Sequence, residues 1–392
     1  MESFFRTHEY LIGHLNAPVR RDLMDEIDWN KRLICIKGTR GVGKTTFLLQ
    51  YAKEKFAEGD RSCLYVNTNN FYIQTIGLTA FADEFYHTGG KVLLVDQAFK
   101  LTDWSKQMRE CHDKYPGLKI VFTTSSVDHI GEYDELKGIV NTYNLRGFSF
   151  REYLNLKSGL NFGHHSLDDI IENHEKIAAE IVEKTDPYKY FNDYLHHGFY
   201  PFFLEKRNYS ENLLKTMNMM IEVDILIIKQ IELKYLAKIK KLFYLLTTGE
   251  LKAPNVSLLA KELDMSRATV MHYIEYLKDA RLVNMIYKKG ESFPKKPARI
   301  LLHNPNLMHS FYPMRFDEFD QLEAFFCNTM WKDHRVAKGK NLGTLVIDDD
   351  KEFRIIEHAT SLKSKSKTIF AVNHAHVGRG NQIPLWLFGF LY

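Results

Sequence analysis

Short apolar runs alternate with amphipathic stretches between residue 31 and about residue 150. The apolar runs read RLICIKG, CLYVN, KVLLVD, KIVFTTSS and IVNTYNL. Between the first two runs, apolar residues recur at helical spacing: Phe47, Leu48, Tyr51, Ala52 and Phe56. Runs of this length are typical of buried strands, and helices between them are typical of a parallel sheet with helical covers. The pattern therefore predicts an α/β core.

Outside this core the pattern changes twice. Residues 151–235 read as aromatic-rich helices, with a turn predicted at Gly198 and Pro201. From residue 236 a helix leads through Pro254 into a helix, a short turn, a second helix and two strands around a basic loop. Strand-like runs follow at GTLVID, FRIIEH, TIFAV and IPLWLFGFLY. We predict five parts. They are an N-terminal helical segment (1–30), the α/β core (31–158), a helical lid or linker (159–235), a winged helix-turn-helix (236–303) and a small C-terminal α/β domain (304–392).

Composition sets broad limits. The chain has 392 residues, a net charge of +4 and 45% hydrophobic residues, which is ordinary for a globular protein of two or three domains. This mildly basic balance permits a nucleic-acid partner without arguing for one. The N-terminus lacks the pattern of a secretory signal, no apolar run approaches the roughly 20 residues that span a bilayer, and four cysteines are widely scattered. We expect a reduced, cytoplasmic protein with no membrane partner.

One stretch carries specific chemistry. Residues 38–45, GTRGVGKT, fit the P-loop (Walker A) pattern G-x-x-x-x-G-K-[ST], with a predicted strand before it and a helix after it. In such a loop, backbone N–H groups close on phosphate oxygens, the lysine reaches the β- and γ-phosphates, and the hydroxyl ligates Mg²⁺. The sequence therefore predicts an ATP and Mg²⁺ site built from Gly38, Thr39, Arg40, Gly41, Val42, Gly43, Lys44, Thr45 and Thr46.

A second motif follows about fifty residues later. Asp96 ends the apolar strand VLLVD, at the sheet edge where open α/β folds bind ligands, so we predict a water-mediated contact to Mg²⁺. Gln97 takes the position where a glutamate would polarise the attacking water. Thr124, near the end of the next strand, is a candidate for reading the γ-phosphate, as are its neighbours Thr123, Ser125 and Ser126.

Gln97 leaves three interpretations open. An amide orients water but accepts no proton at neutral pH, so the protein is a slow or non-hydrolysing ATP binder in the first interpretation. In the second, another carboxylate such as Asp103 or Glu110 serves as the base. In the third, glutamine has been introduced into a glutamate-containing original. Arg146 and Arg151 are candidates for stabilising transition-state charge.

Several motifs, in their order along the chain, are similar to those of a known family. The chain resembles, nearly end to end, a large prokaryotic group of AAA+-type ATPases that join an ATPase core to a winged helix and a C-terminal domain of restriction-endonuclease-like appearance. The resemblance rests on RLICIKGTRGVGKTTFLLQY, LLVDQAFKLTDWSKQMRECHDKYPGLKIVFTTSS, LRGFSFREYL, HGFYPFFLE, PNVSLLAKEL, KPARILLHNPNLM and NQIPLWLFGFLY. It implies an AAA+ fold that binds ATP and Mg²⁺, with a winged helix of the DNA-binding type.

The chain departs from the pattern of this family in three places. Gln97 replaces the usual glutamate, Thr124 replaces a glycine before the serine pair, and Ile139 replaces a frequent arginine. All three departures lie at the nucleotide and bear on hydrolysis rather than on binding.

The predicted winged helix offers a nucleic-acid surface. Ser266 is expected to cap its second helix, whose first turn presents Arg267 and Thr269, with His272 one turn later. The basic loop between the two strands suits phosphate contacts. The candidate DNA-binding residues are Arg267, Thr269, Lys288, Lys289, Lys295 and Lys296; the alternative is a lid or protein-interaction module with a solvated basic rim.

The C-terminal domain lacks a complete nuclease motif. The resembled nucleases need an acid on one strand and Glu-x-Lys on the next. Glu357 is followed two residues later by Ala359, Thr344 stands at the position expected for the first acid, and the nearest downstream lysine is Lys363. We expect an inactive structural or binding domain.

These observations support a Mg-ATP-binding AAA+-type protein with weak or regulated hydrolysis that switches the conformation of the winged helix. The alternatives are an active DNA-dependent ATPase and a non-catalytic, nucleotide-gated scaffold for a partner protein. A homo-oligomer is compatible with all three.

Overall fold

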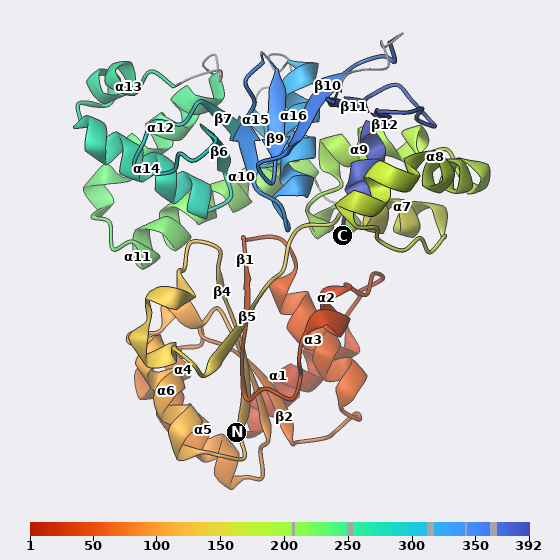
Figure 1. The fold of residues 1–392 in the computed structure, drawn as a ribbon. Helices are drawn as coiled ribbons and strands as arrows, with labels where there is room; N and C mark the ends of the chain where they lie inside the picture. Colours follow the sequence, from red (N-terminus) through yellow and green to blue (C-terminus); the bar gives the residue numbers. More distant parts are fainter. Residues whose placement is uncertain (206–207, 249–253, 312–316, 342, 361–366) are drawn as a thin grey trace. The chain divides into compact units, whose positions relative to one another are not determined.

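The computed structural model describes residues 1–205, 208–248, 254–311, 317–341, 343–360 and 367–392. The chain forms two compact units (Figure 1). The first comprises Met1–Gly147 with Val223–Gln230, and the second comprises Phe148–Glu222 with Ile231–Tyr392. The predicted boundaries at 235/236 and 303/304 thus fall inside the second unit.

The first unit contains a parallel sheet. Its strands have the order β2-β3-β4-β1-β5, and each neighbouring pair is parallel. The register pairs Gly38 with Ser125, so the carboxyl ends of β1 and β4 meet at one edge. All five apolar runs form the predicted strands, which are β1 (Leu33–Gly38), β2 (Cys63–Asn67), β3 (Val92–Asp96), β4 (Lys119–Ser125) and β5 (Val140–Asn144). The predicted α/β fold class is confirmed.

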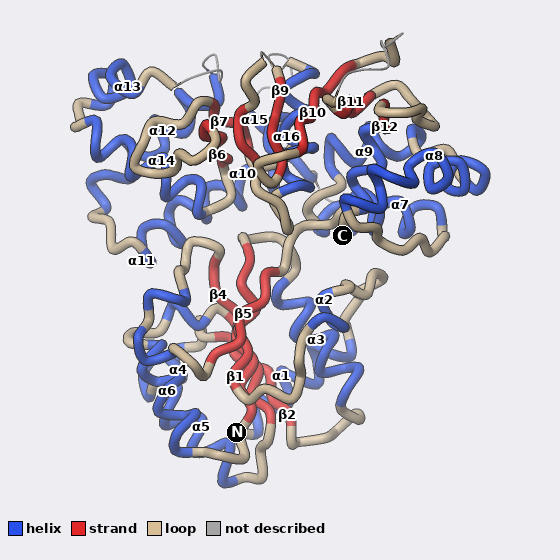
Figure 2. Tube along the Cα trace, in the orientation of Figure 1, coloured by secondary structure: helices blue, strands red, loops and turns tan. Residues whose placement is uncertain are grey.

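Helices cover both faces of this sheet (Figure 2). They are α1 (Glu2–Gly13), α2 (Leu23–Glu26), α3 (Lys44–Lys55), α4 (Phe71–Ile76), α5 (Leu78–His87) and α6 (Trp104–Lys114). Short 3-10 turns follow at Ala98–Lys100, Ile130–Glu132 and Asp134–Leu136. Because side chains alternate along a strand, one face of β1 buries Leu33 and Cys35 with Phe81 and Trp104 in a single apolar core. The next residue along, Ile36, is equally buried on the other face, where α3 lies.

The first part of the second unit is helical, as its aromatic-rich pattern predicted. A capping box of Ser149 and Glu152 starts its first helix. The elements are α7 (Phe150–Ser158), α8 (Leu167–Lys184), α9 (Tyr188–His197), a 3-10 turn at Pro201–Glu205, α10 (Tyr209–Met219), a π-helical turn (Met220–Ile225), a 3-10 turn at Leu233–Tyr235 and α12 (Leu236–Thr248). The second half of the π-helical turn and the short α11 (Leu226–Ile228) belong to the segment Val223–Gln230, which the first unit includes.

A helix, a turn and a second helix then lead into a hairpin. These elements are α13 (Val256–Leu263), α14 (Arg267–Asp279), β6 (Val283–Lys288) and β7 (Arg299–Leu302), with β6 and β7 antiparallel. The predicted cap of α14 is confirmed, since Ser266 Oγ accepts a hydrogen bond from the Thr269 N–H at 3.0 Å. The His272 ring on α14 lies 5.2 Å from the Phe293 ring in the hairpin loop, so this loop packs on the second helix.

The last part of the chain adds two helices and more strands. They are α15 (Pro305–Phe311), α16 (Glu318–Met330), β8 (Val336–Lys338), β9 (Thr344–Ile347), β10 (Lys351–Ile356), β11 (Ile369–Val372) and β12 (Gln382–Pro384). The strands join the hairpin in one mixed sheet with the order β12-β11-β10-β9-β8-β6-β7. Tyr287 and Lys288 of β6 pair in parallel with Ala337 and Lys338 of β8. The hairpin and the C-terminal strands therefore share one sheet.

The final apolar run differs from its predicted strand. Only Gln382–Pro384 are extended, and Leu385–Phe390 form a 3-10 helix whose residues are all buried. A continuous apolar run has no periodicity that separates a strand from a fully buried helix. Pro384 also lacks the N–H that would continue the ladder with β11, so the strand ends there.

No helix among the described residues is both long enough and apolar enough to cross a lipid bilayer. The four cysteines are all buried and free of disulfides.

Candidate functional site

The loop between β1 and α3 is shaped to hold an anion. Gly41 and Gly43 have φ values of 86° and 94°, in the left-handed region that side chains rarely adopt. A Cβ on Gly38 would lie 2.5 Å from the Leu145 carbonyl oxygen, so only glycine fits there. α3 begins directly after Gly43, and its first N–H groups have no partner within the helix. The loop therefore provides backbone donors and the positive end of a helix dipole.

Lys44 begins this helix. Its Nζ donates hydrogen bonds to the carbonyl oxygens of Gly38 at 2.7 Å and Thr39 at 2.9 Å, so the ammonium closes the loop on itself. Burial lowers the pKa of Lys44 to about 8, and the carboxylates of Asp224 and Asp96 oppose that shift. Around Lys44, Thr39 and Val42 are buried, Arg40, Gly41 and Thr46 are half-buried, and Thr45 is exposed.

If residues 38–46 bind ATP as the sequence predicts, this pKa makes the affinity depend on pH. A bound triphosphate raises the pKa of Lys44 above its free value of about 8, because the charged form gains an anionic partner. ATP affinity is therefore expected to be steady between pH 7.5 and 8 and to fall by up to about tenfold per pH unit above 8. Isothermal titration from pH 7.5 to 9.5 measures this, and a flat profile up to pH 9.5 contradicts it.

Asp96 is the centre of a hydrogen-bond network. Its carboxylate is only 1% exposed and accepts bonds from Thr45 Oγ1 at 2.7 Å and from Thr123 Oγ1 at 2.6 Å. Tyr65 OH and Asn67 Nδ2 donate to it at 2.9 and 3.3 Å. Mg²⁺ prefers such oxygen ligands, so the adjacent Thr45 hydroxyl and Asp96 carboxylate fit the ion. The structure thus brings together the two residues that the sequence predicted as its holders.

Gln97 has an unusual backbone and an unsatisfied side chain. Its φ of 62° is in the left-handed region, held by its N–H donating to Thr123 Oγ1 and its carbonyl accepting from Thr68 Oγ1. Its Oε1 is buried and accepts no hydrogen bond from any described residue. A buried acceptor without a donor is costly, so this position suits a group that brings its own hydrogen, such as a water.

The end of β4 places alternate side chains on opposite faces of the sheet. Thr123 binds Asp96, and Ser125 Oγ donates to Asp224 Oδ2 at 3.0 Å. Thr124, between them, donates instead to Asp128 at 2.5 Å. The period of two along a strand could have indicated that Thr123 and Ser125, rather than Thr124, share the face of Asp96.

Asp224 was missed by the sequence analysis. It is 3% exposed, and its carboxylate pairs with Arg40 of the P-loop as well as with Ser125. No local motif marks it, because it lies 184 residues after Arg40 in the chain.

Comparisons with known proteins agree with this geometry. Residues 30–154 match the family described as "AAA domain". They form an AAA-type P-loop domain. Residues 188–302 match a second family, described as "Domain of unknown function (DUF8612)". The match over residues 30–154 supports a nucleotide-binding protein of the AAA type.

Two similar proteins cover much of the chain. The "Uncharacterized protein MJ1637" of Methanocaldococcus jannaschii is 28% identical over 286 residues, which are 68% of this chain and 59% of that protein. The match therefore spans less than two thirds of the relative. "Structure of C. elegans PCH-2" matches with a TM-score of 0.26 and 14% identity, over 71% of this chain and 66% of that one.

Asp103 and Glu110, the other carboxylates considered as bases, are exposed and interact with neighbouring side chains on the surface. Asp103 forms an ion pair with Lys106 at 3.4 Å, and both side chains are largely exposed. Glu110 accepts a hydrogen bond from Thr79 Oγ1 on α5.

The two arginines considered as charge stabilisers have other partners. Arg151, in the second unit, donates to the carbonyl oxygens of Phe162 and Tyr392. The backbone carbonyl of Arg146 accepts from Arg21.

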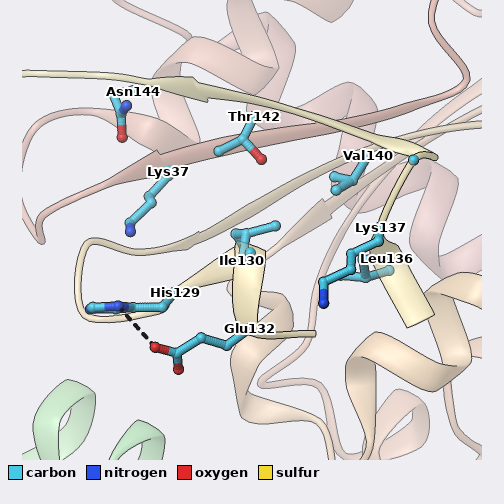
Figure 3. Close-up of a pocket in the computed structure, with 11 residues that line it drawn as sticks. Lys37, His129, Ile130, Glu132, Leu136, Lys137, Val140, Thr142 and Asn144 are labelled. Carbon is cyan, nitrogen blue, oxygen red and sulfur yellow. Dashed lines mark ion pairs between the residues drawn. The ribbon is translucent and has the colours of Figure 1, made fainter. Parts of the chain in front are cut away.

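A separate pocket of the AAA domain is lined by Lys37 of β1 (Figure 3), which pairs with Thr124 in the sheet register and so lies on the Thr124 face. Its volume is about 620 Å³, and its polar lining includes Lys37, His129, Glu132 and Thr142. His129 Nδ1 lies 3.3 Å from Glu132 Oε1. None of the predicted nucleotide residues lines this pocket.

The candidate DNA-binding residues are mostly exposed in the second unit. Arg267, Lys288, Lys289, Lys295 and Lys296 are exposed, and Thr269 is half-buried. Lys289 donates to the Asp349 carbonyl, and Lys295 forms an ion pair with Glu291 at 3.4 Å.

The C-terminal nuclease positions do not converge on a metal. Glu357 is exposed after β10, whereas Thr344 is buried in β9 and donates to the Asn341 carbonyl. Glu323 is buried on α16 in an ion pair with Arg299, and burial raises its pKa to about 7. Lys363 lies outside the described residues. Within the part of the chain that the structure describes, no three His, Cys, Asp or Glu side chains form a metal-binding group.

Proposed function

We propose that this protein binds Mg-ATP at residues 38–46 and hydrolyses it slowly, using the nucleotide to switch the conformation of the helix-turn-helix that follows. The observation that carries this proposal is the hydrogen-bonded pair of Thr45 and Asp96 beside an amide at Gln97. The first feature favours binding of the metal and triphosphate, and the second favours slow cleavage.

Each residue has a defined part in this proposal. Lys44 and the backbone N–H groups of the loop hold the phosphates. The Thr45 hydroxyl and the Asp96 carboxylate would hold Mg²⁺, which would supply positive charge to the phosphates. The buried Gln97 Oε1 accepts a hydrogen bond from the attacking water and orients it, but takes no proton from it.

A slow hydrolase can still act as a switch. ATP shifts a conformational equilibrium only by its difference in affinity for the two states. The segment Val223–Gln230 is part of the first unit and is continuous at both ends with the second. A change at the nucleotide can therefore reach residues 148–222 and 231–392 through the chain itself.

The helix-turn-helix and its hairpin are proposed to be a winged helix that contacts DNA. Two observations favour this: Arg267 is exposed in the first turn of α14, and the exposed lysines of the hairpin lie in a loop that packs on the same helix through Phe293 and His272. If the module instead binds a protein, we expect a protein partner in place of DNA and no steep dependence of binding on salt.

Binding to duplex DNA is expected to weaken steeply with salt. Each phosphate contact contributes a slope of roughly −0.9 in log K against log salt, so the Lys295→Ala, Lys296→Ala double variant should reduce the slope by about 2. Fluorescence anisotropy between 50 and 300 mM NaCl measures it. The control is Lys176→Ala, which removes a largely exposed lysine of α8. A slope near zero in the unaltered protein speaks against DNA contact.

The central test is equilibrium binding of ATP together with single-turnover hydrolysis, each with Mg²⁺ and with or without DNA. We expect tight binding and slow turnover. Fast turnover stimulated by DNA would instead favour the active ATPase, and binding with no detectable turnover would favour the scaffold. Self-association, common among AAA-type proteins, and a prokaryotic, cytoplasmic setting are parts of the same proposal.

A further inference from the structure

Asp224 places a negative charge inside the nucleotide site. It lies in the π-helical turn Met220–Ile225 and is almost fully buried. Its Oδ1 pairs with the Arg40 guanidinium, and its Oδ2 accepts from Ser125 Oγ at 3.0 Å. Both oxygens of the carboxylate are thus engaged by groups at the nucleotide edge of the sheet.

The partners of Asp224 are groups that suit a phosphate. Arg40 is in the P-loop, two residues after Gly38. Ser125 is the last residue of β4 and pairs with Gly38 of β1 in the sheet. The Asp224 charge also acts on two nearby lysines: it raises the pKa of both Lys44 and Lys100 against the lowering that burial causes. A carboxylate that contacts Arg40 and Ser125 and whose charge acts on two nearby lysines occupies an anion position.

We propose that Asp224 is an internal anion that occupies the position of the terminal phosphate, and that it makes the site discriminate against nucleoside triphosphates relative to diphosphates. This inference rests on the proposed nucleotide site. A triphosphate must displace the carboxylate from Arg40 and Ser125, because two anions cannot share the same donors in a buried site. A diphosphate, which lacks the terminal group, leaves the carboxylate in place.

Asp224 lies in a π-helical turn, so its displacement would change the backbone at that point of the chain. A π-helical turn is a rare conformation that is frequent at functional sites. This turn lies where the chain passes from the second unit into the segment 223–230 of the first. Movement of Asp224 away from Arg40 would change this turn and thereby report the presence of the third phosphate to the rest of the chain.

An alternative role as a metal ligand fits the contacts less well. The Arg40 guanidinium, paired with Oδ1, puts a positive charge where a metal ion would have to bind, while Oδ2 accepts from Ser125. These roles remain distinguishable by the direction of the effect on affinity.

The test compares ATP and ADP affinity in the unaltered protein and in Asp224→Asn, by isothermal titration with Mg²⁺. If the carboxylate fills the phosphate position about nine-tenths of the time, its removal tightens ATP binding about tenfold. ADP affinity should change by less than about threefold. Glu222→Gln is the matched control, because it removes one exposed negative charge from the same π-helical turn.

The outcomes separate this inference from the nucleotide site itself. Tighter ATP binding with unchanged ADP binding supports the internal anion, and a misfolded variant cannot produce it. Unchanged affinities in Asp224→Asn and in a second variant, Asp224→Ala, overturn the internal anion while leaving ATP binding intact. Weaker ATP binding in folded variants also overturns it and makes Asp224 a holder of the nucleotide or metal. No binding of either nucleotide by any variant overturns the nucleotide site and this inference together.

Discussion

Replacing Lys44 with alanine is expected to weaken ATP binding by about 10- to 100-fold. The substitution removes an ammonium that closes the P-loop through the Gly38 and Thr39 carbonyls and that would face the β- and γ-phosphates. A hydrogen bond to a charged group contributes roughly 1.5–3 kcal/mol, and about 1.4 kcal/mol corresponds to a factor of ten in affinity. Isothermal titration with Mg-ATP measures the change, with a thermal melt to confirm that the variant is folded.

Lys37→Ala is the matched control for this substitution. Lys37 is in β1, one residue before Gly38, but its side chain lines the separate pocket on the Thr124 face. The control should therefore bind ATP nearly as well as the unaltered protein. If Lys44→Ala and Lys37→Ala bind ATP equally well, residues 38–46 are not the nucleotide site.

The Gln97→Glu substitution is expected to raise the rate of ATP hydrolysis by about 10²- to 10⁴-fold. A general base contributes a factor of this size, and a glutamate carboxylate has nearly the same shape as the glutamine amide that it replaces. The position can accommodate the glutamate, because hydrogen bonds to Thr123 and Thr68 hold the backbone and Gln97 Oε1 is buried without a donor. Single-turnover release of phosphate in the presence of Mg²⁺ measures the rate.

Gln74→Glu serves as the control for the added charge. Gln74 is an exposed residue of α4 in the same AAA domain, so the change should leave the rate unaltered. Equal rates for the unaltered protein and Gln97→Glu would show that position 97 does not limit the chemistry. In that case the interpretation of a slow hydrolase limited by its amide is wrong.

The parts of the site that are local in sequence could be predicted. A glycine-rich loop between a strand and a helix has few possible geometries, and Asp96 follows a buried strand whose end must reach the same edge as β1. The cap at Ser266 was predictable for the same reason, since its hydrogen bond spans only three residues. In each case the residues that make the interaction also define the pattern.

The parts that depend on distant residues could not be predicted. Nothing near Asp224 in sequence indicates that Arg40 and Ser125 meet it, because that contact arises only when the chain returns to the first unit. The face of Thr124 was open to prediction by strand alternation, but a run of four hydroxyl residues carries no polarity difference to set the register. The parallel pairing of β6 with β8 is likewise a long-range contact with no local signal.

That pairing has a mechanical consequence for any nucleotide-driven switch. Backbone hydrogen bonds connect the hairpin after α14 to strands that run as far as β12, near the end of the chain. A hinge between the helix-turn-helix and the C-terminal strands would have to break this ladder, which is far costlier than rotating a flexible linker. The moving body is therefore expected to be large and stiff, with the hairpin and the C-terminal strands displaced together.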